Sequence, residues 1–187
     1  LAAIAAVERA RPGVPAVACF DTAFHARLPA AAATYALPLE WRERFGLRRF
    51  GFHGLSHAYA ARRGAELLGL PATTRVVSCH LGAGASLAAV RDGASLDTTM
   101  GFTPLEGVPM ATRSGSVDPG ALLYLLRERG LSVDELDRAI EHDSGLLALG
   151  GLEQPLGFSV FTYRIAQAVA AMAAALGSGS GATFALI

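Results

Sequence analysis

The sequence predicts an α/β fold. Three short strands are expected in succession, at residues 76–80, 85–91 and 95–99, and segments with helical spacing follow them as far as residue 176. Apolar residues make up 52% of the chain and charged residues 17%, so there is ample apolar surface to offset the conformational entropy lost on folding. The length of 187 residues corresponds to one domain or one and a fraction, at about 150 residues per domain.

The N-terminal segment begins within a helical pattern, which Pro12 and Gly13 end, and the chain does not start with Met. These two features predict a fragment of a longer protein. An apolar run at residues 14–20 is expected to form a buried strand. Residues 26–40 are rich in Ala and Pro without a clear period, which favours a loop.

Hairpin signals connect the three central strands. Gly82 and Gly84 lie in the first connection, and the second is Asp92-Gly93, a dipeptide typical of two-residue hairpin turns. Three antiparallel strands in succession, followed by helices, form a recurring half-domain in α/β nucleotide-binding folds.

Cap residues and helical spacing predict the remaining elements. Asp118 before Pro119 is typical of a helix start, and Ser132 with Glu135 forms a capping box. Ser56 is expected to cap an earlier helix. These signals give a helical turn at residues 41–45, a strand at 48–52, helices at 56–68, 119–129, 132–142 and 164–176, and a flexible linker at 177–181.

Charge and composition exclude several classes of protein. Lys+Arg and Asp+Glu number 16 each, and this zero net charge argues against nucleic-acid binding, which needs an excess of basic residues. The most apolar stretch, residues 165–176, is too short to span a bilayer, and no leader-like segment opens the chain. Cys19 and Cys79 are too few for a disulfide framework. We therefore expect a soluble, cytoplasmic chain without a membrane or nucleic-acid partner.

A glycine-rich turn after the first central strand is the first candidate site. Its backbone N–H groups can approach phosphate oxygens closely, although a plain hairpin turn explains the same pattern. It lacks the Lys of a P-loop and no helix follows it directly, so it matches neither that loop nor the Rossmann turn. The residues of this turn are His80, Leu81, Gly82, Ala83 and Gly84.

Two charged residues are further candidates. Arg113 lies in a polar, turn-rich segment and is either a solvated loop arginine or a fork of donors for phosphate or carboxylate. Asp21 follows an apolar run, where open α/β sheets place ligand contacts, but a turn or helix-capping aspartate has the same signature.

His53 lies between two glycines at the predicted strand-to-helix turn, where small neighbours leave its ring accessible. His57 follows four residues later, but Gly54 lies between the two and no acidic ligand is close, which argues against zinc. We expect no metal ligands in this chain. His57 and His142 are expected to be structural, and the sequence leaves the role of His25 open.

Together these segments resemble the acetate kinase (acetokinase) family, whose relatives include propionate and butyrate kinases. The matching blocks occur in family order over nearly the whole chain: FDTAFH, YALP, RRFGFHGLSH, HLGAGASLAAV, DTTMGFTPLEGVPMATRSG and DPG. The resemblance implies the fold shared by sugar kinases, actin and Hsp70-type ATPases, here truncated. Residues 1–22 would be a remnant of the N-terminal domain, and residues 23–187 an incomplete C-terminal nucleotide-binding domain.

By this resemblance the family's catalytic aspartate falls on Asp21, and its two transition-state stabilisers fall on His53 and Arg113. Its phosphate-binding turn falls on residues 80–84, where Ala83 replaces the usual Asn. The implied reaction is reversible phosphoryl transfer from ATP to acetate, with Mg²⁺, giving acetyl phosphate and ADP. The implied assembly is a homodimer. A propionate or butyrate kinase is an alternative, and so is a degenerate remnant that folds or binds a partner without turnover.

The chain departs from the family pattern at both ends and once inside. It has no counterpart of the N-terminal Asn-Cys-Gly-Ser-Ser-Ser turn, and residues 151–157 replace a longer stretch containing Asp-Met-Arg. After Leu176 it lacks the Gly-Gly-Ile-Gly-Glu turn and a metal-binding glutamate. We therefore expect this chain by itself to form no measurable acyl phosphate in a hydroxamate assay, and clear turnover would refute that expectation.

Overall fold

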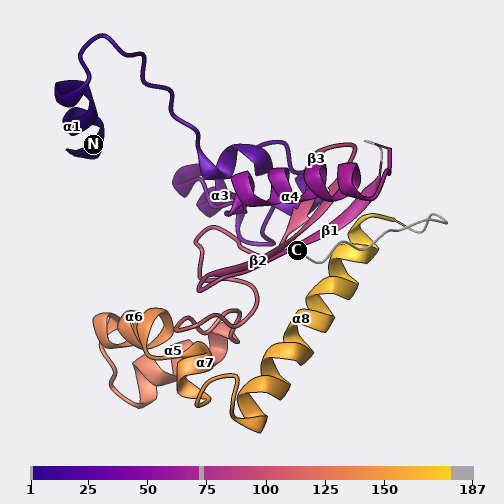
Figure 1. Cartoon of the computed structure of the whole chain (residues 1–187). Coiled ribbons are helices and arrows are strands. Elements are labelled where there is room, and N and C mark those ends of the chain that lie inside the picture. Colours follow the sequence, from indigo (N-terminus) through magenta and orange to yellow (C-terminus); the bar gives the residue numbers. More distant parts are fainter. Residues whose placement is uncertain (1, 72–73, 178–187) are drawn as a thin grey trace.

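A three-stranded sheet forms the centre of the protein in the computed structural model, which describes residues 2–71 and 74–177 (Figure 1). Its strands are β1 (Arg75–Leu81), β2 (Ala85–Arg91) and β3 (Ala94–Thr98), and each pairs antiparallel with the next. The three strands expected from the sequence are therefore confirmed. Asp92 and Gly93, between β2 and β3, have φ values of 53° and 72°, as a tight two-residue hairpin turn requires.

Two long helices enclose the sheet. α4 (Gly54–Leu67) packs on one face, where Ala61 joins side chains of β1 and β2 in a small apolar core. α8 (Pro155–Ala175) packs on the other face. Because alternate side chains of a strand point to opposite faces, β2 is buried on both sides. The buried core on the α8 side consists of Val77, Cys79, Ala85, Leu87, Ala89, Met100, Val108, Met110, Met172 and Leu176.

The helix starts predicted at Asp118 and at Ser132 are confirmed. The Asp118 side chain accepts a hydrogen bond from the N–H of Gly120 at the start of α5 (Pro119–Glu128). Both hydrogen bonds of the capping box are present at Ser132, which begins α6 (Val133–His142). A short helix, α7 (Gly145–Ala148), follows and was not expected.

The expected strand at residues 14–20 is wrong. This segment is extended but exposed, and none of the described strands pairs with it. An apolar run becomes a buried strand only beside a neighbouring strand, and Val17 is 83% exposed here. The segment instead connects α1 (Ala2–Ala10), which stands apart from the sheet, to the 3-10 helix η1 (Asp21–His25) (Figure 1).

Residues 26–52 depart from expectation in two further places. The expected loop contains a short helix, α2 (Ala30–Ala33), before the confirmed helical turn, α3 (Leu39–Phe45). The expected strand at residues 48–52 is wrong, because its backbone bonds alternate between different partners. Arg49 donates to the carbonyl of Ala33, whereas Phe50 donates to that of Gly101. The segment therefore crosses between two parts of the chain without joining a ladder.

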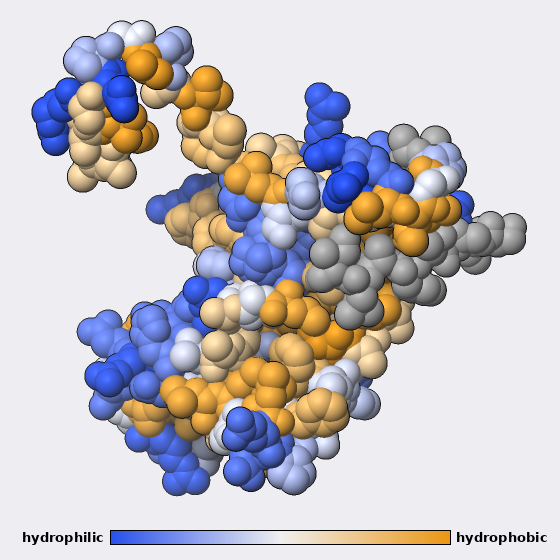
Figure 2. Space-filling model, viewed as in Figure 1, coloured by the Kyte–Doolittle hydropathy of each residue, from blue (hydrophilic) through white to orange (hydrophobic). Residues whose placement is uncertain are grey.

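α8 is longer than the apolar stretch that the sequence singled out, because Pro155 begins it nine residues before the predicted start at 164. It contains an 18-residue window of mean hydropathy 1.2, enough to cross a membrane by length and composition alone. Near its C-terminal end Met172 is buried in the core against the sheet. Leu156, Phe158 and Tyr163 remain exposed, and Figure 2 shows hydrophobic patches over this part of the surface. Beyond Gly177, the predicted linker lies outside the described residues.

Candidate active site

Asp21 lies at the N-terminus of α4. Its carboxylate accepts hydrogen bonds from the backbone N–H of His53 and, at 3.3 Å, from that of Leu55. Asp21 therefore caps this helix, which begins at Gly54, and Ser56 does not do so as expected. A side chain at Gly54 would overlap the carbonyl oxygen of Asp21, so the glycine permits this close approach. The capping interpretation of Asp21 is correct, and its role toward a ligand stays a prediction.

His53 precedes α4 in a left-handed conformation, with φ 56° and ψ 26°. Its Nδ1 lies 2.9 Å from the Ser86 hydroxyl, and its ring stacks on that of His80 with centroids 4.1 Å apart. Burial lowers the pKa of His53, and the neighbouring His80 lowers it further. His53 is therefore a neutral imidazole at neutral pH, fixed in position by β2 and by the ring from β1.

Gly84 brings the glycine-rich turn against both His53 and Arg113. A Cβ built on Gly84 would lie 3.3 Å from His53 Nε2 and 3.5 Å from Arg113 Nη1. The N–H of Ala111 also donates to the carbonyl of Ala83 at 3.1 Å, which joins the turn to the segment that carries Arg113. The structure thus brings together the turn, the imidazole and the guanidinium, and through the backbone of His53 it places Asp21 beside them.

The Arg113 side chain is held from one side by Glu141. The Glu141 carboxylate lies 3.1 Å from Arg113 Nε, and Nη1 points toward the Pro104 carbonyl at 3.5 Å. The backbone around Arg113 is fixed by the junction of α6 and α7, because Ser144 donates to Thr112. Among the described residues no hydrogen bond involves Nη2, so one edge of the guanidinium is available for an anion.

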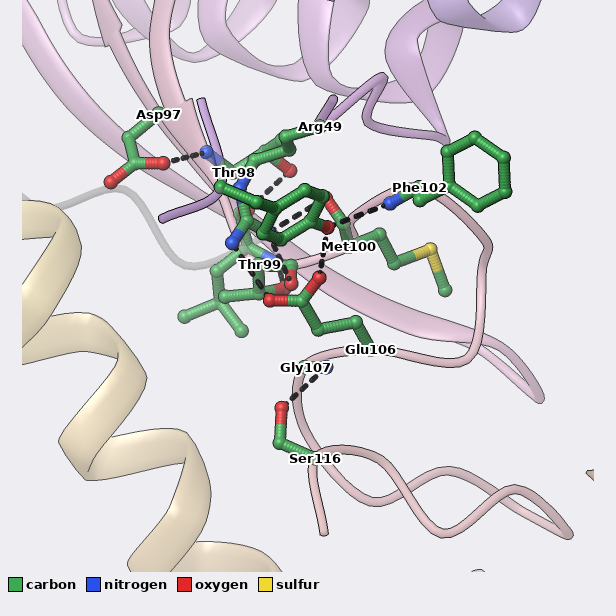
Figure 3. Close-up of polar contacts among 11 residues, drawn as sticks. Arg49, Asp97, Thr98, Thr99, Met100, Phe102, Glu106, Gly107 and Ser116 are labelled. Atoms are coloured by element: carbon green, nitrogen blue, oxygen red, sulfur yellow. Dashed lines mark hydrogen bonds and ion pairs between the residues drawn. The ribbon is translucent and has the colours of Figure 1, made fainter. Parts of the chain in front are cut away.

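A polar clamp anchors the loop between β3 and Arg113 (Figure 3). Glu106 accepts from Arg49 Nη2 at 2.7 Å and from the Tyr35 hydroxyl, while Arg49 Nη1 donates to the carbonyls of Thr99 and Met100. Burial and the bond to Glu106 raise the pKa of Tyr35 to about 12. No local sequence pattern predicts this clamp or the role of Glu141, because the partners lie more than twenty residues apart.

Replacing Glu106 by glutamine is expected to lower the free energy of unfolding by about 1–3 kcal/mol. Glutamine presents one oxygen and one NH₂, so either Arg49 or Tyr35 loses its acceptor in a site where the Arg49 side chain is 17% exposed. Urea denaturation measures the change. Glu40→Gln is the matched control, because the ion pair of Glu40 with Arg44 is exposed and should contribute little. Equal stability of the two variants would show that the clamp does not stabilise the fold.

His57 and His25 are both buried beneath the site. His57 contacts the hydroxyls of Ser78 and Ser86, and burial lowers its pKa to about 3. His25 contacts the Ser95 hydroxyl and the Phe52 carbonyl. His57 is thus packed into the structure, as expected. His142, by contrast, is exposed at the end of α6.

The model of the acetokinase family matches residues 1–184 of the chain. The chain belongs to the acetokinase family. It is 49% identical to the acetate kinase of Synechococcus sp. (strain JA-2-3B'a(2-13)) over 189 aligned residues, covering 92% of this chain and 46% of that relative. Identity to the acetate kinase of Deinococcus radiodurans is 46% over 198 residues, covering 97% of this chain and 50% of that relative.

Solved structures of acetokinase proteins share the fold. The crystal structure of Porphyromonas gingivalis acetate kinase matches with a TM-score of 0.88 at 39% identity, covering 94% of this chain and 48% of that one. A propionate kinase from Francisella tularensis matches with a TM-score of 0.86 at 36% identity, covering 95% of this chain and 50% of that one. The chain thus spans about half the length of the relatives it matches, and the expected truncated α/β fold of this family is confirmed.

Proposed function

We propose that the protein containing this chain transfers the γ-phosphoryl group of ATP reversibly to acetate, giving acetyl phosphate and ADP. Membership of the acetokinase family supports this reaction. The observation that carries it is the position of Gly84, whose missing side chain leaves space beside both His53 Nε2 and Arg113 Nη1. An anionic oxygen placed there would meet a permanent cation and an imidazole at once.

The chemistry explains these residue types. A carboxylic acid with a pKa near 4–5 is ionised at neutral pH, so its oxygen attacks the γ-phosphorus without a general base. As the new O–P bond forms, the bond to the bridging oxygen breaks and ADP leaves. The barrier lies in bringing two anions together, so catalysis consists of positioning and positive charge. In the proposed roles, Arg113 supplies charge in fork geometry and His53 donates a hydrogen bond to an equatorial phosphoryl oxygen.

In this proposal the remaining candidate residues, 80–84 and Asp21, bind the nucleotide. The backbone N–H groups of residues 80–84 cradle a phosphate. This contact requires the two glycines, and it does not require the side-chain amide of the Asn that Ala83 replaces. Mg²⁺ is expected to enter with ATP, and it neutralises charge on the phosphate oxygens when bound. In the proposed role, the carboxylate of Asp21 orients the metal-bound nucleotide.

The organisation of the whole protein is part of the proposal. We propose residues 1–22 as a remnant of the N-terminal domain and residues 23–187 as an incomplete C-terminal nucleotide-binding domain. The exposed position of α1 and of the segment after it supports this division. Exposed apolar side chains on α8, such as Phe158, support burial against a further surface, consistent with a homodimer. We also propose a cytoplasmic location for the whole protein.

A propionate kinase is the second candidate, because a solved propionate kinase matches this fold closely. The test is a hydroxamate assay of the whole protein with ATP, Mg²⁺ and either acetate, propionate or butyrate. We expect the largest kcat/KM with acetate. A larger value with propionate or butyrate would favour the second candidate, since one methylene is worth about 1–3 kcal/mol. Absence of turnover with all three acids in a folded protein would favour a non-catalytic remnant.

A further inference from the structure

A chain of hydrogen bonds runs from the core to His53. The Ser78 hydroxyl lies 2.9 Å from Nδ1 of His57, and His57 Nε2 lies 2.8 Å from the Ser86 hydroxyl. Ser86 lies in turn 2.9 Å from Nδ1 of His53. Ser78 and Ser86 are directed to the α4 face of the sheet, and both are buried with His57.

We propose that Ser78, His57 and Ser86 form a hydrogen-bond relay of fixed direction, which holds His53 in the tautomer with its proton on Nε2. In this direction Ser78 donates to His57 Nδ1, the Nε2–H of His57 donates to Ser86, and Ser86 donates to His53 Nδ1. The remaining proton of His53 then lies on Nε2, the ring atom that approaches Gly84. The three relay residues are positioning residues, since His53 alone faces the candidate active site.

The direction follows from the requirement that buried donors find acceptors. In the reverse direction, His53 donates to Ser86, Ser86 to His57, and His57 to Ser78. The Ser78 hydroxyl proton would then need another acceptor, and within residues 2–71 and 74–177 Ser78 Oγ bonds to His57 alone. Ser78 is 1% exposed, so water does not supply that acceptor, and a buried unsatisfied donor costs about 1–3 kcal/mol. The forward direction leaves only the half-buried Nε2–H of His53 to be satisfied.

Each imidazole in the relay carries one proton, as the directional argument requires. Burial lowers the pKa of His57 to about 3, and the nearby His25 and His53 act in the same direction. Burial and His80 lower the pKa of His53. A neutral imidazole has one donor and one acceptor nitrogen, so the bond at one nitrogen determines the state of the other.

The relay has a consequence for the proposed phosphoryl transfer, and this consequence rests on that proposed function. A neutral His53 with Nε2–H is a hydrogen-bond donor toward an anion beside Gly84, without needing a positive charge. Arg113 by itself favours the opposite tautomer, because a cation stabilises a lone pair directed at it. The relay opposes that preference and keeps a second donor next to the guanidinium.

The test is two-bond ¹H–¹⁵N correlation NMR of the chain labelled with ¹⁵N-histidine, recorded well above the ordinary imidazole pKa of about 6.5. The nitrogen shifts report the tautomer directly and require no substrate and no turnover. We expect both His53 and His57 to show the Nε2–H pattern. An Nδ1–H pattern for either ring in the unmodified chain overturns the proposal.

Ser86→Ala removes the donor to His53, so the Nδ1–H form gains population and the two nitrogen shifts of His53 move toward each other. Ser95→Ala is the matched control, since this buried serine bonds to His25 and not to the relay, and it should leave His53 unchanged. An unchanged His53 in Ser86→Ala contradicts the relay. If Ser86→Ala fails to fold, the tautomers measured in the unmodified chain still test the proposal. A positive NMR result alongside an inactive whole protein would reject the proposed function and leave the relay intact.

Discussion

Replacing Arg113 by alanine is expected to lower kcat of the whole protein by about 10²–10³-fold, the effect of removing one preorganised charge donor from a transition state. Arg113 is held by Glu141 with its Nη1 atom beside Gly84, so it needs no rearrangement as charge develops. Steady-state hydroxamate assays with saturating ATP and acetate measure the change. Arg113→Lys keeps the positive charge and loses the two-pronged guanidinium geometry. Its kcat is therefore expected to lie between those of the unmodified protein and Arg113→Ala.

The free energy of unfolding should change little in Arg113→Ala. The Arg113 side chain is 32% exposed, and a partly exposed ion pair contributes less than about 1 kcal/mol. The matched control is Arg138→Ala, which removes an exposed pair with Asp143 near the end of α6, the helix that carries Glu141, and should leave kcat unchanged. A normal kcat in Arg113→Ala would remove this residue from the catalytic machinery. A large loss of stability would instead make it a structural arginine.

Local signals predicted the fold well where the determinants lie within a few residues. The Asp92-Gly93 turn and the capping box at Ser132 depend on neighbouring side chains and on allowed backbone angles, and both are present. The strand predicted at residues 14–20 is wrong because strand formation depends on a partner strand, which composition does not reveal. The strand predicted at residues 48–52 is wrong for a similar reason, since the backbone hydrogen bonds of this segment go to two separate parts of the chain.

The sequence suggests the residues of the candidate site, whereas it does not reveal the residues that hold them in place. Asp21, His53 and Arg113 lie in distinctive blocks of sequence. The structure brings His53 and Arg113 together beside Gly84, and Asp21 accepts a hydrogen bond from the backbone of His53. Glu141 is one acidic residue in a helix that shows an ordinary amphipathic pattern, so only the fold reveals its bond to Arg113. Ser78 and Ser86 lie on facing strands, and period-two alternation places them on one face once the strand register is known.

Acidification from about pH 7 to about pH 5 is expected to lower the free energy of unfolding by about 2 kcal/mol through His57 alone. The pKa of His57 is about 3 in the folded chain, against about 6.5 in an unfolded one. Between these values the unfolded chain binds a proton that the folded chain does not. The stabilisation is therefore complete above the unfolded pKa and is lost as the pH falls toward the folded pKa. The lowered pKa values of His25 and His53 act with the same sign.

Urea denaturation at several pH values between about 7 and 5 measures this effect, in a range where carboxyl groups with pKa values near 4 contribute little. The slope of the unfolding free energy against pH counts the protons taken up on unfolding, at about 1.4 kcal/mol per proton and pH unit. His57→Gln should reduce the slope by about one proton, whereas His142→Gln, at an exposed position, should leave it unchanged. If His57→Gln does not fold, a flat slope in the unmodified chain still contradicts the prediction. A flat profile would mean that His57 is already protonated in the folded chain, where the hydrogen-bond partners of its ring among the described residues are two serine hydroxyls.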